Sequence, residues 1–442
     1  MVTPVPFTLE PNGGNLFKPD ATKNSLEMAK RVNLLSGARK DAIMPVMVVY
    51  TAQLSGGPTA VMQDILDIPA GTTSGDTEFL KDHYANLIIE TALMLGYRTT
   101  SNPNPGTILF NPDMLGALQQ SDVINSTFRK KDGSYVKVNV RAKLQAAIDY
   151  VYDNQAYAAS LGYTVVLPAT KPSLPADLTD DIKGWFQSQN WVVKTFGQNA
   201  IPYGWQLNLW AQGTSTWIHG VNGDKNKPHT DATLWRDASG QVAAFLDDTG
   251  VYKGAYVPDF VAIDRYEYDD FREAARNINY AYDSQDWKNF LTYTRQISSY
   301  LQRPAMLWQV PASHILTTNE SIPNPDYVTL HSGAAGSFFM GDPALGVGAK
   351  NAASVMRSIP LNGQPYFGGQ TSVGSWLDLF PAYDWTQDQL QLTINSNVFS
   401  ILWGGGNTMG VIETAATGND GGWMMQRTKD YYTHKLKPLV RK

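Results

Sequence analysis

Short apolar runs alternate with longer segments of helical periodicity along most of the chain. Apolar runs of this length are typical of strands that are buried on both faces of a parallel sheet. The runs predict strands at Met44–Tyr50, Thr107–Phe110, Trp205–Leu209, Phe260–Ile263, Ala305–Gln309, Ser337–Met340 and Val398–Trp403. Helical spacing predicts helices at Asn24–Leu35, Phe79–Leu95, Val140–Tyr152, Thr179–Phe186, Asp231–Leu246, Ser284–Leu301 and Gly422–Leu436.

This alternation predicts an α/β fold in which right-handed crossovers join parallel strands. The first strong strand is not followed by a Gly-x-Gly-x-x-Gly sequence. A (β/α)8 barrel of the TIM type, closed or distorted, is therefore favoured over a dinucleotide-binding sheet. The composition does not break along the chain, so we expect a single domain with long strand-end loops. Residues 1–40 would form an N-terminal extension packed on the barrel, and residues 41–442 the catalytic barrel.

Carboxylates crowd the end of one predicted strand. The apolar run Phe260–Ile263 leads directly into Asp264 and Arg265, and Glu267 follows between two tyrosines. In a barrel of parallel strands this end carries the chemistry. Carboxylates held close together in a partly desolvated cleft have pKa values that are pushed apart, as acid/base catalysis requires. The structural alternative is a solvated strand-to-helix turn whose acids cap the next helix.

Polar and aromatic residues also end the other predicted strands. Amides and acids bind hydroxyl groups, and planar rings provide a flat apolar surface that suits a sugar ring. The candidate substrate-binding residues are Tyr50, Asn111, Asp113, Gln206, Asn208, Trp210, Tyr266, Trp308, Gln309 and Trp403. At least two of the three tryptophans in this set are expected to expose their rings in one cleft.

Glycoside hydrolysis needs one protonated and one ionised carboxyl group. Glu267 is the candidate general acid, because it follows a strongly apolar strand. Asp264 is the candidate nucleophile or base, provided that Arg265 turns toward it. In a chitin-like mechanism Asp264 would instead orient a substrate N-acetyl group. Asp342, at the end of the predicted strand Ser337–Met340, is a third candidate catalytic acid.

Composition narrows the class of partner. The chain has 442 residues, a formal net charge of −5 and 11% aromatic residues. This balance argues against a nucleic-acid partner, which would need a phosphate-neutralising surface. The chain has no cysteine, which excludes disulfides, thiol nucleophiles and Cys-ligated zinc.

Neither a metal-binding motif nor a targeting signal is evident in the sequence. His219 and His229 share a polar loop with Asp224 and Asp231, but their spacing matches no zinc motif. We expect a solvated loop there, and no metal or other cofactor. No signal peptide and no apolar run long enough to cross a membrane are visible. The hypothesis is a secreted, monomeric mature domain without a membrane partner, with an intracellular location as the alternative.

Two short segments resemble polysaccharide-degrading (β/α)8 glycoside hydrolases. Pro45–Tyr50 is similar to the opening strand of the cellobiohydrolase and endoglucanase family that has a distorted barrel. Phe260–Glu267 resembles the chitinase signature, although two residues separate Asp264 from Glu267 where that family has one. The resemblance implies a hydrolase of cellulose-like or chitin-like chains. The rival hypotheses are a non-catalytic carbohydrate-binding barrel or surface protein, and a metal-dependent barrel hydrolase or lyase.

Overall fold

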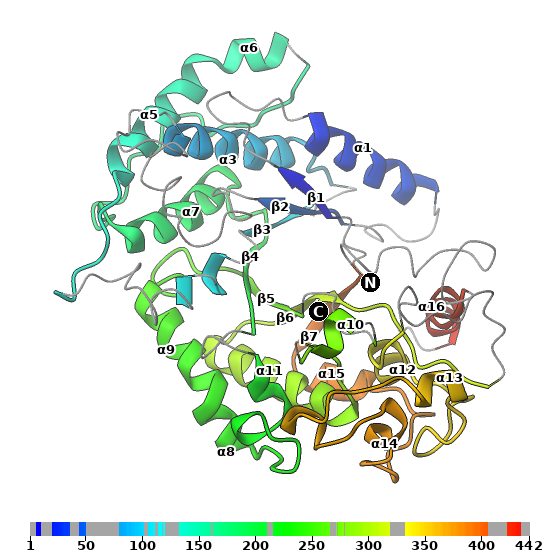
Figure 1. Ribbon diagram of the computed structural model, residues 1–442. Helices are drawn as coiled ribbons and strands as arrows, with labels where there is room; N and C mark the ends of the chain where they lie inside the picture. Colours follow the sequence, from blue (N-terminus) through cyan, green and yellow to red (C-terminus); the bar gives the residue numbers. More distant parts are fainter. Residues whose placement is uncertain are drawn as a thin grey trace. The chain divides into compact units, whose positions relative to one another are not determined.

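A computed structural model gives the architecture of the protein (Figure 1). The residues that it describes are 6–9, 20–35, 44–49, 79–100, 105–110, 114–116, 118–119, 132–160, 162–209, 215–265, 271, 273–277, 279–318, 332–404 and 422–434. The chain divides into two compact units. Unit 1 comprises Met1–Gly213 and Ala243–Ala262, and unit 2 comprises Thr214–Val242 and Ile263–Lys442.

The strands follow one another in chain order, as expected for an α/β fold with parallel strands. They are β1 (Pro6–Leu9), β2 (Val46–Val49), β3 (Thr107–Phe110), β4 (Tyr203–Leu207), β5 (Phe260–Asp264), β6 (Ala305–Val310) and β7 (Val398–Trp403). The recorded pairs β1–β2, β2–β3, β3–β4 and β6–β7 are all parallel. Strand β1 was not predicted from the sequence. It lies within residues 1–40 and pairs in parallel with β2. Closure into a (β/α)8 barrel stays a prediction, as does the division into an extension and one barrel domain.

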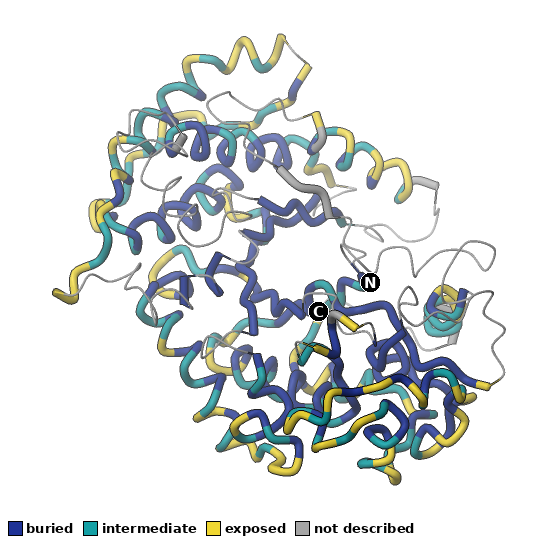
Figure 2. Tube along the Cα trace, in the orientation of Figure 1, coloured by how far each residue is buried: buried dark blue, intermediate teal, exposed yellow. Residues whose placement is uncertain are grey.

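In unit 1, helices pack on one face of β1–β4. These helices are α1 (Asp20–Leu35), α3 (Phe79–Gly96), α5 (Val140–Asp153) and α7 (Ile182–Phe196). The short helix α6 (Gln155–Ser160) follows α5 and has no buried residue, and α9 (Gly240–Thr249) lies for the most part in this unit. Phe110 and Trp205 stack with ring centroids 4.8 Å apart, and Trp205 also contacts Trp185 and Phe186 of α7. Strands β2, β3 and β4 are buried along their whole length (Figure 2).

The opposite face of β4 is crowded at Gly204. A Cβ atom on this residue would lie 2.5 Å from a ring carbon of Phe260 in β5. Glycine therefore allows the Phe260 ring to lie directly over the neighbouring strand.

Unit 2 consists of β6, β7 and many short helices. The helices are η1 (Thr216–His219), η2 (Val221–Gly223), α8 (Asp231–Leu234), the π-helix η3 (Trp235–Ser239), α10 (Glu273–Asn277), α11 (Ser284–Leu301), α12 (Ala335–Met340), α13 (Ser354–Arg357), η4 (Pro365–Phe367), α14 (Val373–Leu377), α15 (Leu390–Asn395) and α16 (Trp423–His434). The long helix α11 begins with a capping box in which Asp283 accepts from the backbone N–H of Asp286 and Asp286 accepts from that of Asp283.

The prediction of a strand at Ser337–Met340 is wrong, because this segment lies in helix α12. Every residue of α12 is buried. Phe338 stacks on Trp287 and Tyr383, whereas Phe339 packs edge-on against Trp287 and Trp403. A short helix that is apolar on all sides has the same sequence pattern as a buried strand.

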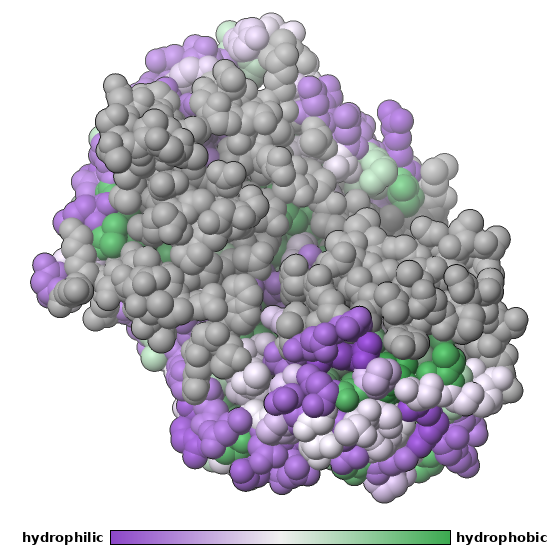
Figure 3. Space-filling view, viewed as in Figure 1, coloured by the Kyte–Doolittle hydropathy of each residue, from purple (hydrophilic) through white to green (hydrophobic). Residues whose placement is uncertain are grey.

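The described surface of unit 2 is mostly hydrophilic on the face shown in Figure 3, with small hydrophobic areas between. Within the described ranges, none of the helices combines the length and the apolar character needed to cross a membrane.

Candidate functional site

Asp264 is the last residue of β5, and its side chain is only 2% exposed. It stands at the carboxyl end of a parallel strand, where ligands of α/β proteins bind. The residues that follow it, including Tyr266 and the candidate acid Glu267, lie outside the described residues. Tyr50, Asn111, Asp113 and Trp210 also lie outside them.

In unit 1 the structure buries two predicted amides near the end of β4. Gln206 is fully buried, and alternation along the strand turns it away from Trp205 and so away from helix α7. Asn208 is 7% exposed and lies against Gly116, where an added Cβ would come within 2.4 Å of the amide oxygen.

Two of the predicted tryptophans are in the described part of the chain. Trp308 is 4% exposed and belongs to the core, so the expectation of an exposed ring is wrong for this residue. Trp403 is half-buried, and it packs against a small cluster formed by Ala312, Met340 and Met424. The expectation failed at Trp308 because a strand-end residue of β6 can point into the core as readily as into a cleft.

Asp342 is buried and follows helix α12, not a strand. Its carboxylate accepts a hydrogen bond from the backbone N–H of Ala344 at 3.0 Å, as in an Asx turn. Gly341, with φ of 69°, ends the helix in a left-handed conformation just before it. The role of Asp342 as a catalytic acid stays a prediction. The reason given for it, a position at the end of a strand, does not hold, because Asp342 follows a helix.

Strand β6 is irregular at its carboxyl end. The register with β7 shifts between Leu307 and Val310, and Gln309 within this bulge has φ of 51°. A left-handed conformation is costly for a residue with a side chain, by about 1–2 kcal/mol. β-Bulges redirect side chains and are frequent beside active sites. Gln309 is half-buried, and its role in substrate binding stays a prediction, which its strained backbone gives a reason to test.

The condition set for the role of Asp264, that Arg265 turns toward it, is not met. Its guanidinium lies 3.6 Å from the centroid of the Tyr282 ring and donates from Nη2 to the carbonyl of Tyr280. The side chain is 1% exposed, and its Nε and Nη1 have no hydrogen-bond partner. Neighbouring residues of a strand point to opposite faces, so Arg265 packs toward the helices while Asp264 points the other way.

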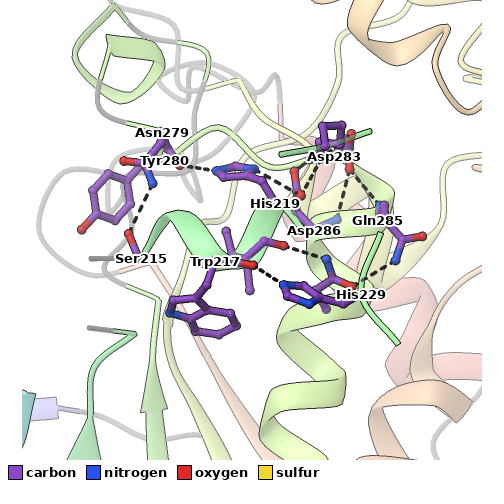
Figure 4. Close-up of polar contacts among 12 residues, drawn as sticks. Ser215, Trp217, His219, His229, Asn279, Tyr280, Asp283, Gln285 and Asp286 are labelled. Atoms are coloured by element: carbon purple, nitrogen blue, oxygen red, sulfur yellow. Dashed lines mark hydrogen bonds and ion pairs between the residues drawn. The ribbon is translucent and has the colours of Figure 1, made fainter. Parts of the chain in front are cut away.

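Behind Tyr282 lies a buried polar network, which Figure 4 shows in part. The His219 ring packs edge-on against Tyr282, with centroids 5.5 Å apart. His219 Nδ1 lies 3.2 Å from an oxygen of Asp286, and Nε2 lies 2.8 Å from the carbonyl of Asn279. The expectation of a solvated loop histidine is therefore wrong, because this ring is 1% exposed.

Lys225 completes this network. Its ammonium lies 2.8 Å from Asp283 and 2.5 Å from Asp286, and both carboxylates are buried. It also lies over the ring of Trp376 at 5.6 Å from the centroid. We call His219, Lys225, Asp283 and Asp286 the buried charge network.

The two carboxylates of the network have different pKa values. Burial raises the pKa of Asp283 to about 6, and the charge of Asp286 adds to this effect. Burial alone would also raise the pKa of Asp286, but Lys225 and His219 outweigh it and lower the pKa to about 2. The contacts of His219 and Lys225 with Asp283 and Asp286 anchor the first turn of α11 to η1 and to the segment that follows η2. His219 also packs against Tyr282, on which Arg265 lies.

The sequence analysis missed the network. Asp283 and Asp286 carried one signal, since Asp-Ser-Gln-Asp before an apolar-periodic segment is a capping pattern. Lys225 carried none, because a lysine in a polar loop is normally solvated. Among the described residues, no group of three or more His, Asp or Glu side chains is arranged to hold a metal ion.

No protein-family model matches the chain, and no curated protein matches its sequence. Among solved structures, the chain is similar to a glycoside hydrolase family 6 enzyme from Coprinopsis cinerea, with a TM-score of 0.31 and 10% identity. The similarity covers 69% of this chain and 60% of the enzyme's chain, which is less than two thirds of the neighbour's length. A likeness this weak assigns no family and no site residue.

Proposed function

We propose that the protein is a glycoside hydrolase that cleaves β-linked polysaccharide of the cellulose or chitin type. The observation that carries the proposal is the buried carboxyl group of Asp264 at the carboxyl end of β5. A carboxyl group removed from solvent at this end of a parallel strand is positioned for chemistry and contributes little to packing.

In this proposal Glu267 protonates the leaving oxygen and Asp264 acts as the nucleophile or base. Arg265 is a positioning residue. Its aromatic contacts and the buried charge network behind them hold the end of β5 in place, and rigid support of this kind makes a catalytic carboxylate effective. Gln309 would bind a substrate hydroxyl group, and Asp342 is the reserve acid. We also propose a secreted monomer whose partner is a polysaccharide or oligosaccharide.

The test is hydrolysis of swollen cellulose, colloidal chitin and soluble oligosaccharides by the full chain and its variants. Glu267→Gln and Asp264→Asn should each lower turnover by at least about 100-fold, because each removes one proton-transferring or charge-stabilising group. Asp259→Asn is the matched control. Asp259 stands just before the amino end of the same strand and pairs with Lys194 on the surface, so its variant should hydrolyse normally.

Thermal unfolding of each variant establishes that the fold is retained. Near-normal turnover by Glu267→Gln would refute the assignment and make Asp342→Asn the next variant to assay. Binding of polysaccharide without hydrolysis by the unmodified chain would favour a carbohydrate-binding protein instead. The separation of the two carboxyl groups in a substrate complex decides the stereochemistry, with about 5 Å implying retention and about 6.5–9.5 Å inversion.

A further inference from the structure

Unit 2 exposes a pair of aromatic rings on its surface. Trp235 is 38% exposed and Tyr300 is 42% exposed, and their ring centroids are 5.7 Å apart. The two ring planes are inclined by 50° to one another. Aromatic rings of this size are normally buried, and each exposed ring leaves an apolar face in contact with water. We call Trp235 and Tyr300 the aromatic platform.

The local backbone fixes the orientation of Trp235. This residue opens the π-helix η3, which joins α8 to α9. Gly240, at the end of η3, has no side chain that would obstruct the indole: an added Cβ would lie 2.9 Å from Trp235 Nε1. π-Helical turns are rare and frequently mark functional sites. Glycine at position 240 therefore leaves the room that the Trp235 indole occupies.

Helix α11 carries the second ring and fastens it to the first. Ser239 donates to the side-chain oxygen of Gln296 at 2.7 Å, and the amide nitrogen of Gln296 donates to the carbonyl of Asp231 at 2.8 Å. Tyr300 lies one helical turn beyond Gln296 on the same face of α11. The two hydrogen bonds thus set the distance between the rings before any ligand binds.

Two ion pairs lie in the segments that carry the platform. Arg236 pairs with Asp237 at 2.5 Å, and Arg295 pairs with Asp231 at 2.7 Å. Two exposed aromatic rings among hydrogen-bonding ion pairs suit a ligand that is uncharged, has apolar faces that can stack on each ring, and is bordered by hydroxyl groups. A pyranose ring has this chemistry, whereas a nucleic acid or an anionic lipid would need unpaired positive charge.

The platform lies away from the proposed catalytic end of the strands. Tyr300 is in the last turn of α11, and the chain then enters β6 at Ala305, its amino end. Asp264 and Gln309 stand at the carboxyl ends of their strands. A ligand that contacts the platform is thus outside the reacting region, which suits a long polymer and not a short sugar.

We propose that Trp235 and Tyr300 form a second, non-catalytic binding site on which sugar rings of a neutral polysaccharide chain stack. The inference rests on the proposed function for the identity of the polymer. The platform holds the enzyme on insoluble substrate while the strand ends act on a chain.

The test is the binding isotherm of the full chain on swollen cellulose and colloidal chitin, measured in the Glu267→Gln background so that turnover does not interfere. Trp235→Ala and Tyr300→Ala should each weaken binding by about tenfold, the effect of losing one stacking contact. Gly240→Ala should weaken it similarly, because the added Cβ would meet the carbonyl oxygen of Trp235 at 2.8 Å and Nε1 at 2.9 Å, and so would displace the π-helical turn together with an intact indole. Trp235→Phe should retain most of the affinity. Tyr157→Ala removes another exposed ring, 61% exposed, and should leave binding unchanged.

Isotherms of the Trp235→Ala and Tyr300→Ala variants that match that of Tyr157→Ala would overturn the inference, as would the absence of binding to both polymers. These results are independent of hydrolysis. A chain that binds through the platform but never hydrolyses supports the inference and refutes the proposed function. A chain that hydrolyses polysaccharide, and that binds equally well after Trp235 or Tyr300 is replaced, supports the proposed function and refutes the inference.

Discussion

Glu90 lies within helix α3 with its side chain fully buried. Burial raises the pKa of Glu90 from 4.5 to about 8. Between these values the folded protein keeps a proton that the unfolded chain has released. Stability must therefore fall as the pH rises through this window, and the contribution of the protonated carboxyl is complete only below its unfolded pKa.

Glu90→Gln should remove this dependence, because glutamine has nearly the same shape and no charge to lose. At pH 7 the variant should be more stable than the unmodified protein by on the order of 3 kcal/mol, and at pH 5 by much less. Guanidinium unfolding at both pH values measures the difference. Glu273→Gln, at an exposed position of α10, is the control and should show no such change. A difference that is the same at pH 5 and pH 7 would contradict the assignment.

Gln309 combines a strained backbone with a proposed contact to substrate. Glycine accepts φ of 51° without strain, so Gln309→Gly should stabilise the fold by about 0.5–1 kcal/mol. The same change should reduce hydrolysis, because it removes the amide. Gln302, the left-handed C-cap of α11 with φ of 53°, provides the control. Gln302→Gly should give a similar stabilisation, measured by thermal unfolding, and unchanged hydrolysis; equal activity of both variants would exclude a role for the Gln309 side chain.

At the scale of elements, one lysine joins segments that are far apart in the chain. Lys225 follows η2, its backbone N–H donates to the carbonyl of Pro365 in η4, and its ammonium contacts Asp283 and Asp286 at the start of α11. The packing of these short elements therefore depends on a charge that is buried with two opposite charges. Their short hydrogen-bonded turns supply little stability of their own.

Lys225→Met should destabilise the protein by about 3–5 kcal/mol, because it leaves two buried carboxylates without their cation. Lys227→Met is the matched control, since Lys227 is 63% exposed and pairs only with Asp224 on the surface. Urea unfolding should show a large loss of stability for the first variant and little change for the second. The loss at Lys225 should shrink in Asp283→Asn and Asp286→Asn backgrounds. Equal, small effects of both lysine variants would contradict a structural role for the network.

Sequence patterns predicted helices and strands correctly where the pattern depends on residues that are close together in the chain. The helices at Val140 and Ser284 begin at the predicted residues. Periodicity acts within a few residues in both, and a capping box also fixes the start at Ser284. The pattern was misleading at α12, where an apolar run bounded by glycine fits a buried helix and a buried strand equally well. The prediction of a solvated loop around His219 was wrong, because the side chains of His219 and Lys225 contact Asp283 and Asp286 at the start of α11.

At the scale of the whole molecule, the strands follow chain order, and β5 contributes residues to both compact units. Parallel pairing places all carboxyl ends of neighbouring strands at one edge. The described polar residues at the ends of strands within one unit therefore lie along one edge of its strands. The proposed hydrolase assigns its chemistry to this edge, and the aromatic platform belongs to the other end of α11.

The sequence by itself determined the α/β class, most of the strands and the position of Asp264 at a strand end. These features depend on hydrophobic periodicity and on residues that are adjacent in the chain. Only the tertiary structure decided that Arg265 packs on tyrosines, that Lys225 is buried between two carboxylates, and that Trp235 meets Tyr300. Each of these contacts joins distant segments, and its free energy comes from desolvation and packing, which exist only once those segments are brought together.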